Sequence, residues 1–444
     1  MKKFAKYFLI CLIIIPCMFL FTGCDWFSGE SAYQIAVRNG YTGTEQQWLD
    51  SLIGSNGSDG TNSDPITIMD IYETAVDEGY TGTFLDFLYD YFGIDSGTAS
   101  DDVYAVNKSI LSAVTLSCVF KGSVRSGGAG VIYKLDDTTG DAYIITNYHV
   151  IYNTKAVGGD KFAHTIVARI YGYETLESDA INVSYIGGSM EYDIAVVKTS
   201  DASGRKLLKD SYARQAEICK NPLIIGERAI AVGNPEGDGI SATVGIVNVD
   251  SEYFTMKAAD DATNITLRAV RVDTAINPGN SGGGLFNSNG ELIGIVNAKL
   301  VGVDVDNMGY AIPLNIATGV ADNIIRNCNG TTVKTINKGD LGANLAIFSS
   351  KAIYDDATKI ISIVEEVAIE SISSGAGYGV LQVGDKITKV LFNGEYINIT
   401  REYIINDLML CVEAGDTIKF YVTRMGNPID VNVTFQNSNF ANVI

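Results

Sequence analysis

Hydrophobic and polar positions change over short distances in the middle of the chain, and this pattern predicts strands. Between about Val103 and Ala317, β-branched and aromatic runs are separated by Gly, Asp and Asn, as in GVIYKL, AYIITNYHVIY, DIAVVK and ELIGIVNAKL. Many short strands at this spacing are typical of an all-β barrel or sandwich. A more polar stretch from Thr199 to Asn221 has helical spacing in its middle and divides the region. We therefore expect two successive β units.

The pattern changes after about Thr331, where strand-like and helix-like segments follow one another. A Gly-rich turn, SSGAGYG, lies among them. The segment has about 100 residues, which is enough for an independent domain. We predict a small α/β domain over residues 330–444, with a helix near 401–411 and strands near 343–348, 360–365, 386–392 and 417–424.

Two copies of one pattern precede the strands. YQIAVRNGYTGTEQQWLDSLIG begins at Tyr33 and YETAVDEGYTGTFLDFLYDYFG begins at Tyr72, and the two align without gaps. Each copy predicts a short helix, a turn and a second amphipathic helix. We therefore predict two helical hairpins within residues 24–104 and interpret them as a spacer or docking arm without catalytic residues. Binding of surface partners by this arm is compatible with an activity elsewhere in the chain.

The first residues have the character of an export signal. Three lysines precede an apolar run from Tyr7 to Phe21, and Thr22-Gly23-Cys24 follows. Small residues before a cysteine at this place resemble the lipobox of bacterial lipoproteins, in which the cysteine is lipidated. We expect residues 1–23 to be a signal peptide and Cys24 to be the lipidation site, with an uncleaved membrane anchor as the alternative. Both interpretations predict an exported chain tethered to the outer face of a bacterial cell membrane.

Charge and cysteine usage narrow the classes of partner and cofactor. The 444 residues carry a formal charge of −20, which argues against nucleic acid because phosphate binding needs a basic surface. Beyond Cys24 the cysteines are widely scattered, with no Cys-x-x-Cys pair. Neither a zinc site nor a disulfide scaffold is therefore predicted. We expect no metal and no cofactor.

The stretch INPGNSGGG, residues 276 to 284, raises the question of a nucleophile. A Gly/Ser/Asn cluster is ordinarily a turn, and Ser281 becomes a strong nucleophile only where a base takes its proton. The chain has two histidines. His149 follows an apolar strand in IITNYHVIY, whereas His164 begins what reads as an ordinary strand. His149 is therefore the candidate base.

A histidine base needs an acid on its other ring nitrogen. Asp193 begins the apolar run DIAVVK, whereas Asp179 lies in an acidic loop and Asp273 stands close before the serine. The order His149, Asp193, Ser281 is that of chymotrypsin-like double barrels. The first two residues are then expected from the first barrel and the serine from the second.

The glycines beside the serine have a role in this scheme. Gly279 lets the backbone turn so that its N–H and that of Ser281 point at one spot, with Asn280 between them. Two such donors form an oxyanion hole. We therefore predict the oxyanion hole at Gly279, Asn280 and Ser281.

At this point the chain resembles a known family. TNYHV, DIAVVK, AVGNPEG, TVGIVN, DTAINPGNSGGGL, GELIGIVNAK and MGYAIPL, in this order, resemble the HtrA (Deg) family of trypsin-like serine proteases. The resemblance implies a protease domain over residues 105–329 with the triad His149, Asp193 and Ser281. It also implies a PDZ domain over residues 330–444, where DLGANLAI and GVLQVGDKITKV match. Homotrimers are common in the family, but their contacts lie near the protease N-terminus, where this chain carries its repeats.

The residues just upstream of Ser281 predict specificity. In chymotrypsin-like folds a residue shortly before the serine floors the S1 pocket, and an acid there selects basic side chains. Ala275 and Ile276 occupy this neighbourhood. We therefore expect an apolar pocket that accepts Val, Ala, Ile or Leu.

Together these features predict a protein-quality-control enzyme. It is expected to be a tethered, extracytoplasmic serine endopeptidase that degrades unfolded or damaged exported proteins, with the PDZ domain capturing peptide segments. The alternative is a non-proteolytic holdase or peptide-binding surface protein that uses the same surfaces.

Overall fold

The computed structural model describes residues 42, 74–77, 79–80, 101–170, 180–235, 239–300 and 308–444. The chain divides into two compact units, Met1–Ser100 and Asp101–Ile444. In the first unit, residues 74–77 are helical. Most of both predicted helical hairpins, the signal segment and Cys24 lie outside the described residues. None of the helices in the described part has the length and apolar character needed to cross a bilayer.

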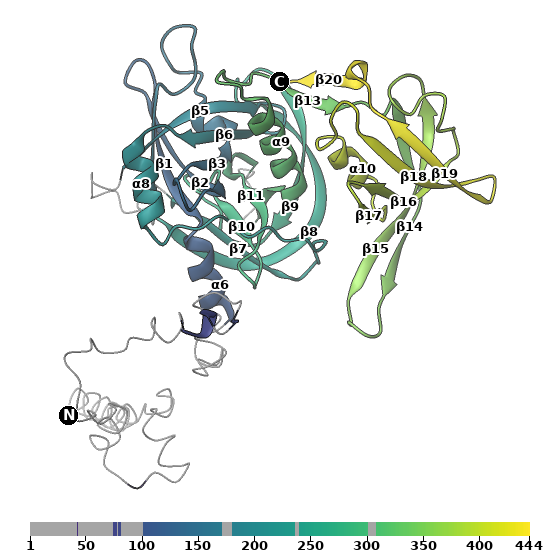
Figure 1. Cartoon of the computed structure of the whole chain (residues 1–444), viewed down its shortest axis with the longest axis horizontal. Helices are drawn as coiled ribbons and strands as arrows, with labels where there is room; N and C mark the ends of the chain where they lie inside the picture. The colour runs from purple at the N-terminus through teal and green to yellow at the C-terminus, as the bar shows by residue number, and fades with distance from the viewer. Residues whose placement is uncertain are drawn as a thin grey trace, which may run out of the picture. The chain divides into compact units, whose positions relative to one another are not determined.

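The first half of the predicted β region is a closed barrel (Figure 1). Its strands follow the order β1-β2-β3-β6-β5-β4, and each pairs antiparallel with its neighbours. Helix α6 (Asp101–Ile110) precedes the barrel. The six strands are β1 (Ala113–Val119), β2 (Arg125–Leu135), β3 (Ala142–Asn147), β4 (Thr165–Ile170), β5 (Ile181–Ser189) and β6 (Ile194–Thr199).

A second closed barrel follows, with strand order β10-β11-β12-β9-β8-β7. Helix α8 (Ala202–Asp210) forms in the polar stretch that separates the barrels, where the Asp201 side chain accepts from the Gly204 N–H as an N-cap. The pair of β units expected from the sequence is therefore confirmed. The second barrel contains β7 (Arg228–Gly233), β8 (Ser241–Lys257), β9 (Asn264–Val272), β10 (Gly284–Phe286), β11 (Leu292–Val296) and β12 (Gly309–Pro313).

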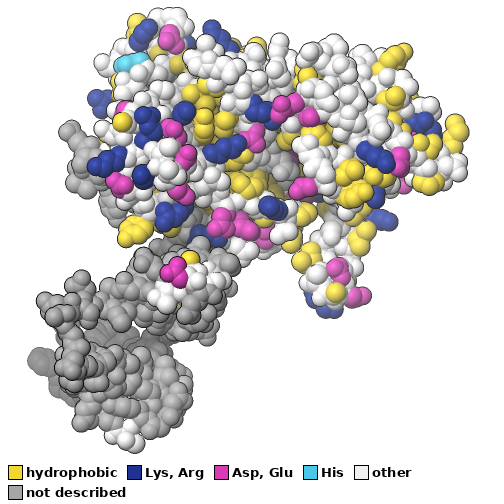
Figure 2. Space-filling model, in the orientation of Figure 1, with side chains coloured by type: hydrophobic (Ala, Val, Ile, Leu, Met, Phe, Trp, Pro, Cys, Tyr) yellow, Lys and Arg dark blue, Asp and Glu magenta, His cyan; other side chains and the backbone are white. Residues whose placement is uncertain are grey.

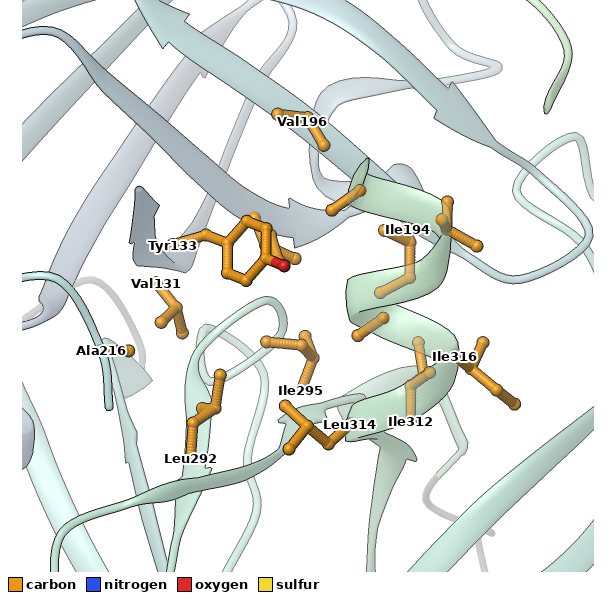
Figure 3. Close-up of a cluster of buried hydrophobic side chains, with 14 of the residues drawn as sticks. Val131, Tyr133, Ile194, Val196, Ala216, Leu292, Ile295, Ile312, Leu314 and Ile316 are labelled. Carbon is orange, nitrogen blue, oxygen red and sulfur yellow. The ribbon is translucent and has the colours of Figure 1, made fainter. Parts of the chain in front are cut away.

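One apolar core joins the two barrels. Val131 of β2 and Ile194 of β6 share a buried cluster with Ile295 of β11 and Ile312 of β12. Helix α9 (Leu314–Asn327) packs into the same cluster through Leu314 and neighbouring residues, as Figure 3 shows. Because this shared core fixes one barrel against the other, residues from both can meet with defined geometry.

The C-terminal region, residues 336–443, is built on a sheet of order β14-β15-β16-β18-β19, with β17 paired to β16. A short helix, α10 (Tyr403–Leu408), occupies part of the helix predicted near 401–411. Strands β13 (Ile336–Gly339) and β20 (Phe440–Val443) form a separate pair. The remaining strands are β14 (Ala343–Tyr354), β15 (Ile361–Ile372), β16 (Lys386–Phe392), β17 (Glu395–Asn398), β18 (Thr417–Arg424) and β19 (Asn427–Thr434).

A buried ion pair connects the C-terminal region with the second barrel. Arg268 of β9 donates from Nη2 to Oδ2 of Asp407 in α10, and both side chains are almost fully buried. The guanidinium carbon of Arg268 lies 4.0 Å from the ring centroid of Tyr403. Burial raises the pKa of Asp407 above its ordinary value, and the Arg268 charge opposes this.

Charges of both signs are interspersed on the molecular face drawn in Figure 2. Lys, Arg, Asp and Glu side chains alternate there with hydrophobic ones over the barrels and the C-terminal region. On this face the acidic excess of the chain does not gather into one acidic surface.

Candidate active site

His149 lies in a four-residue helix, α7 (Tyr148–Ile151), directly after β3. Asn147 ends the strand, and its side chain donates from Nδ2 to the Asp193 carbonyl oxygen at 3.0 Å instead of capping the helix. The Tyr148 N–H donates to the same carbonyl at 3.1 Å. These two hydrogen bonds attach the start of α7 to Asp193, the residue that precedes β6.

Three side chains named from the sequence meet in one hydrogen-bonded row. His149 Nδ1 lies 2.7 Å from Asp193 Oδ2, and His149 Nε2 lies 2.9 Å from Ser281 Oγ. The His149 side chain is 19% exposed and that of Asp193 is 4% exposed. His149 and Asp193 come from the first barrel and Ser281 precedes β10 of the second, as the sequence predicts. Such a row can transfer the serine proton to the imidazole.

Both carboxylate oxygens of Asp193 take part in hydrogen bonds. Its backbone adopts a left-handed conformation, with φ of 51°, which Asp tolerates better than most residues. Oδ1 accepts from the His149 N–H at 3.0 Å, and Oδ2 accepts from Asn297 Nδ2 at 2.8 Å. The carboxylate therefore orients the imidazole both through its ring and through its backbone.

Asn297 is a site residue that the sequence analysis did not identify. It follows β11, is fully buried, and reaches Asp193 from the second barrel. Its Oδ1 accepts from the Lys299 N–H at 3.1 Å, which fixes the orientation of the amide. The available signal was a polar residue directly after the apolar strand in GELIGIVNAK.

The competing candidates take other places. Asp273 accepts from the Ile246 N–H at 2.7 Å and so belongs to the β8–β9 ladder. His164 is exposed at the start of β4. Asp179 lies outside the described residues.

The serine loop packs so closely that its glycines are needed. Gly282 has φ of 83°, and a Cβ there would lie 2.2 Å from Thr146 Oγ1 and 2.3 Å from the Ala129 carbonyl oxygen. A Cβ on Gly283 would lie 2.2 Å from the Val232 carbonyl oxygen. The Ala129 N–H donates to the Ser281 carbonyl at 2.8 Å. The first barrel therefore fixes the backbone of the serine loop.

The predicted oxyanion donors lie in this loop. Gly279 has φ of 100°, a conformation that favours glycine. The Asn280 N–H donates to the Asn277 carbonyl at 3.0 Å, whereas the N–H groups of Gly279 and Ser281 have no acceptor among the described residues. The Asn280 side chain is buried, and its Oδ1 also lacks a partner within that part of the chain. The Ala298 N–H reaches Ser281 Oγ at 3.2 Å.

The comparisons with known proteins concern this same region and its surroundings. Residues 128–295 match the family model described as trypsin-like peptidase domain. The chain is 32% identical over 332 residues to the serine protease Do-like HtrA of Lactococcus lactis subsp. cremoris strain MG1363, covering 71% of this chain and 72% of that protein. This chain belongs to the HtrA family. The matched relatives are serine proteases, and this protein is a serine endopeptidase.

A second relative and a solved structure are also similar to this chain. The HtrA protein of Lactococcus lactis subsp. lactis strain IL1403 is 32% identical over 334 residues, again 71% of this chain and 72% of the relative. Among solved structures, the serine endoprotease from Yersinia pestis is 25% identical, covers 76% of this chain and 97% of that one, and has a TM-score of 0.41.

The two residues predicted for the S1 pocket of this HtrA protease differ in their surroundings. Ala275 is exposed, and its carbonyl accepts from Thr243 Oγ1 at 2.8 Å. Ile276 is 7% exposed and belongs to the core of the second barrel, where its Cδ1 would lie 2.6 Å from a Cβ on Gly309. Neither residue carries a charge.

Metal ligands are not grouped in the part of the HtrA chain that the structure describes. No three His, Cys, Asp or Glu side chains come together there in a way that could hold a metal ion.

Proposed function

We propose that Ser281 is the nucleophile of this endopeptidase, His149 its general base and Asp193 the residue that orients the histidine. The observation that carries the proposal is the continuous row from Asp193 Oδ2 through His149 to Ser281 Oγ, with separations of 2.7 and 2.9 Å. Both lie within the reach needed for proton transfer. The row also crosses from one barrel to the other.

The reaction follows from these positions. His149 Nε2 takes the Ser281 hydroxyl proton as Oγ attacks the peptide carbonyl carbon, and the carbonyl oxygen becomes an oxyanion. The N–H groups of Gly279 and Ser281 stabilise this oxyanion, and a single such donor is typically worth about 3 to 4 kcal/mol. His149 then gives the proton to the leaving amine. Water, deprotonated by the same histidine, then attacks the acyl-serine carbonyl. The bond from the acyl carbon to Oγ breaks, His149 returns the proton to Ser281 Oγ, and the acyl group leaves as a carboxylic acid.

We further propose that the substrates are unfolded or damaged exported proteins with apolar residues at P1. Ala275 and Ile276 provide no charge to select lysine or arginine, and an extended, unfolded segment presents its peptide bonds to the serine. Mapping the cleavage sites in casein tests this specificity. We expect Val, Ala, Ile and Leu to dominate at P1, and a majority of Lys and Arg would contradict the proposal.

The remaining parts of the chain suggest where the enzyme acts. We propose that residues 1–23 are an export signal, that Cys24 carries a lipid anchor, and that the arm of residues 24–104 separates the anchor from a protease domain of residues 105–329. Residues 330–444 form a PDZ domain that captures peptide segments by strand addition. A homotrimer is the proposed assembly.

Labelling by a fluorophosphonate probe tests the catalytic assignment. The probe reacts with a serine only when a base activates it. We expect the wild-type protein to be labelled at Ser281 and the His149→Ala variant to remain unlabelled. Equal labelling of both proteins would remove His149 from the proposed mechanism.

A further inference from the structure

A pocket of about 650 Å³ lies in the first barrel, apart from the catalytic serine. Its walls come from the segment before β4, from β5, and from residues 332–334 after α9. The segment after α9 is fixed there because the Val333 N–H donates to the Ile186 carbonyl at 2.8 Å. His149, Asp193 and Ser281 do not line the pocket, but Tyr148, the residue before His149, does.

The inner wall of the pocket is aromatic. The rings of Phe162 and Tyr185 stack with centroids 4.7 Å apart and planes 19° apart. The rings of Tyr148 and Phe162 pack edge to face, with their centroids 5.6 Å apart. Packed rings of this kind are rigid and give an apolar group a preformed surface.

Two hydroxyl groups in this wall lack partners. Tyr148 is only 6% exposed and Tyr185 is half-buried, and neither hydroxyl makes a hydrogen bond to any residue that the structure describes. Burial raises the pKa of both phenols above the ordinary value, so both keep their protons at neutral pH. Tyr148 and Tyr185 both line the pocket, so it offers two phenol groups that can donate to an acceptor on a ligand.

The pocket also offers an ammonium group to a negative charge on that ligand. Lys334 lines it and has no ion pair within the described residues, and His164 lies beside it. Asp160 is an exposed acid in the same lining, and its Oδ1 accepts from the Phe162 N–H at 3.1 Å. An ammonium donor together with phenol hydroxyls matches a carboxylate.

We propose that this pocket binds an apolar group that carries a carboxylate, namely the C-terminal residue of a cleaved peptide. The peptide source rests on the proposed function: hydrolysis leaves a free carboxylate on the P1 residue, and that residue is apolar. The side chain would pack on Phe162 and Tyr185, and the carboxylate would face Lys334. The protease domain would then bind its own product beside the helix that carries His149.

Calorimetric titration of the full-length Ser281→Ala protein tests the proposal, because this variant cannot cut the probe. The probes are N-acetyl-Ala-Ala-Leu as the free acid and as the amide. We expect the acid to bind at least about tenfold more tightly, since a charge-assisted hydrogen bond is lost with the amide. Equal affinity of acid and amide would overturn the proposal. Because the peptide is supplied, the outcome does not depend on whether the enzyme makes it.

Variants separate this pocket from other peptide-binding surfaces of the chain. In the Ser281→Ala background, Lys334→Gln is expected to weaken binding of the acid about tenfold, and Tyr185→Phe severalfold. Lys206→Gln is the matched control, because Lys206 is an exposed lysine on α8 without an ion pair in the described residues. If Lys334→Gln binds the acid as tightly as Lys206→Gln does, the ligand lies elsewhere and the proposal is wrong.

Octanoate distinguishes the two sources of an apolar carboxylate. It carries the same charged group on a flexible chain without peptide bonds. Tighter binding of the tripeptide acid than of octanoate supports a peptide end as the ligand. Tighter binding of octanoate would overturn the peptide assignment.

Discussion

At the scale of single residues, the active site depends on a side chain outside the row of three. Asn297 donates to Asp193 Oδ2 at 2.8 Å from the opposite barrel. Without this donor, the Asp193 carboxylate would lose one of the hydrogen bonds that fix its rotation. The orientation of the His149 ring, which this carboxylate holds, would then be less well defined. Asn297 is thus a positioning residue, since it acts on the reaction through Asp193.

We expect Asn297→Ala to lower kcat about 10- to 100-fold while KM changes little. A hydrogen bond to a charged group is worth about 1.5 to 3 kcal/mol, and each 1.36 kcal/mol is a tenfold change in rate. Steady-state kinetics on a peptide substrate measure both constants, and Asn297→Ser should recover part of kcat.

Asn287→Ala is the control for this prediction. Asn287 is also buried in the second barrel, but its Nδ2 donates a hydrogen bond to Glu291 Oε2 within a turn. Its loss should reduce stability without changing kcat. A kcat for Asn297→Ala equal to that of Asn287→Ala would contradict the positioning role.

At the scale of elements, the serine loop is shaped by contacts with the first barrel. The sequence pattern INPGNSGGG predicted the need for glycine around Ser281, and Gly279 and Gly282 do have positive φ. What the pattern could not predict is that Thr146 and Ala129 of the other barrel would leave no room for a Cβ. Such contacts join distant positions, and a local pattern carries no information on them.

We expect Gly282→Ala to abolish peptidase activity and to destabilise the fold by more than about 1 to 2 kcal/mol. The left-handed conformation alone costs an alanine about that much, and the Cβ would also overlap Thr146 Oγ1. Urea unfolding and the cleavage rate measure the two effects.

Gly394→Ala gives a matched comparison. Gly394 has φ of 82°, and a Cβ there would meet nothing within 4 Å. Substitution of Gly394 should lower the free energy of unfolding only by the cost of the backbone strain, and the peptidase activity should be retained. Equal losses of stability in the two variants would mean that close packing does not constrain the serine loop.

At the scale of the whole molecule, sequence patterns predicted the two barrels well because short β-branched and aromatic runs between turn residues mark buried strands. The order of His149, Asp193 and Ser281 then suggested which barrel supplies each residue, and the structure brings them together. The connection between β9 and α10 was not predicted, because neither Arg268 nor Asp407 stands in a distinctive local pattern. The predicted helical hairpins lie almost entirely outside the described residues and stay a prediction.

The Arg268–Asp407 pair makes a prediction about domain coupling. Asp407→Ala leaves a buried guanidinium without its partner, which typically costs about 3 to 5 kcal/mol. We expect faster limited proteolysis between residues 328 and 336 and a lower unfolding midpoint. The double variant Arg268→Met, Asp407→Leu should restore much of the loss, because two apolar side chains can replace a buried pair.

Glu413→Ala is the matched control for the junction. Its pair with Arg326, at 3.0 Å, is partly exposed, so its loss should cost less than about 1 kcal/mol. Similar effects of Asp407→Ala and Glu413→Ala would contradict the importance of the buried pair.

The same pair has a consequence for the dependence of stability on pH. Because burial raises the folded-state pKa of Asp407, the folded protein holds this proton more tightly than the unfolded chain. Proton binding by Asp407 therefore adds stability below the ordinary carboxyl pKa, and this added stability is lost as the pH rises through the raised value. The pairing with Arg268 is a separate contribution. Relative to Asp407→Asn, the wild-type free energy of unfolding should fall over this range. An unchanged difference between the two proteins would contradict the assignment.

The central claim is that Ser281 performs the proteolysis, and cleavage of an unfolded protein by purified variants tests it most directly. Casein should be degraded by the wild type and by Ser288→Ala, which removes an exposed hydroxyl seven residues after Ser281 in the sequence. Ser281→Ala should fold normally, as judged by circular dichroism and the unfolding midpoint, yet leave casein intact. Proteolysis retained by the purified Ser281→Ala protein would contradict the account.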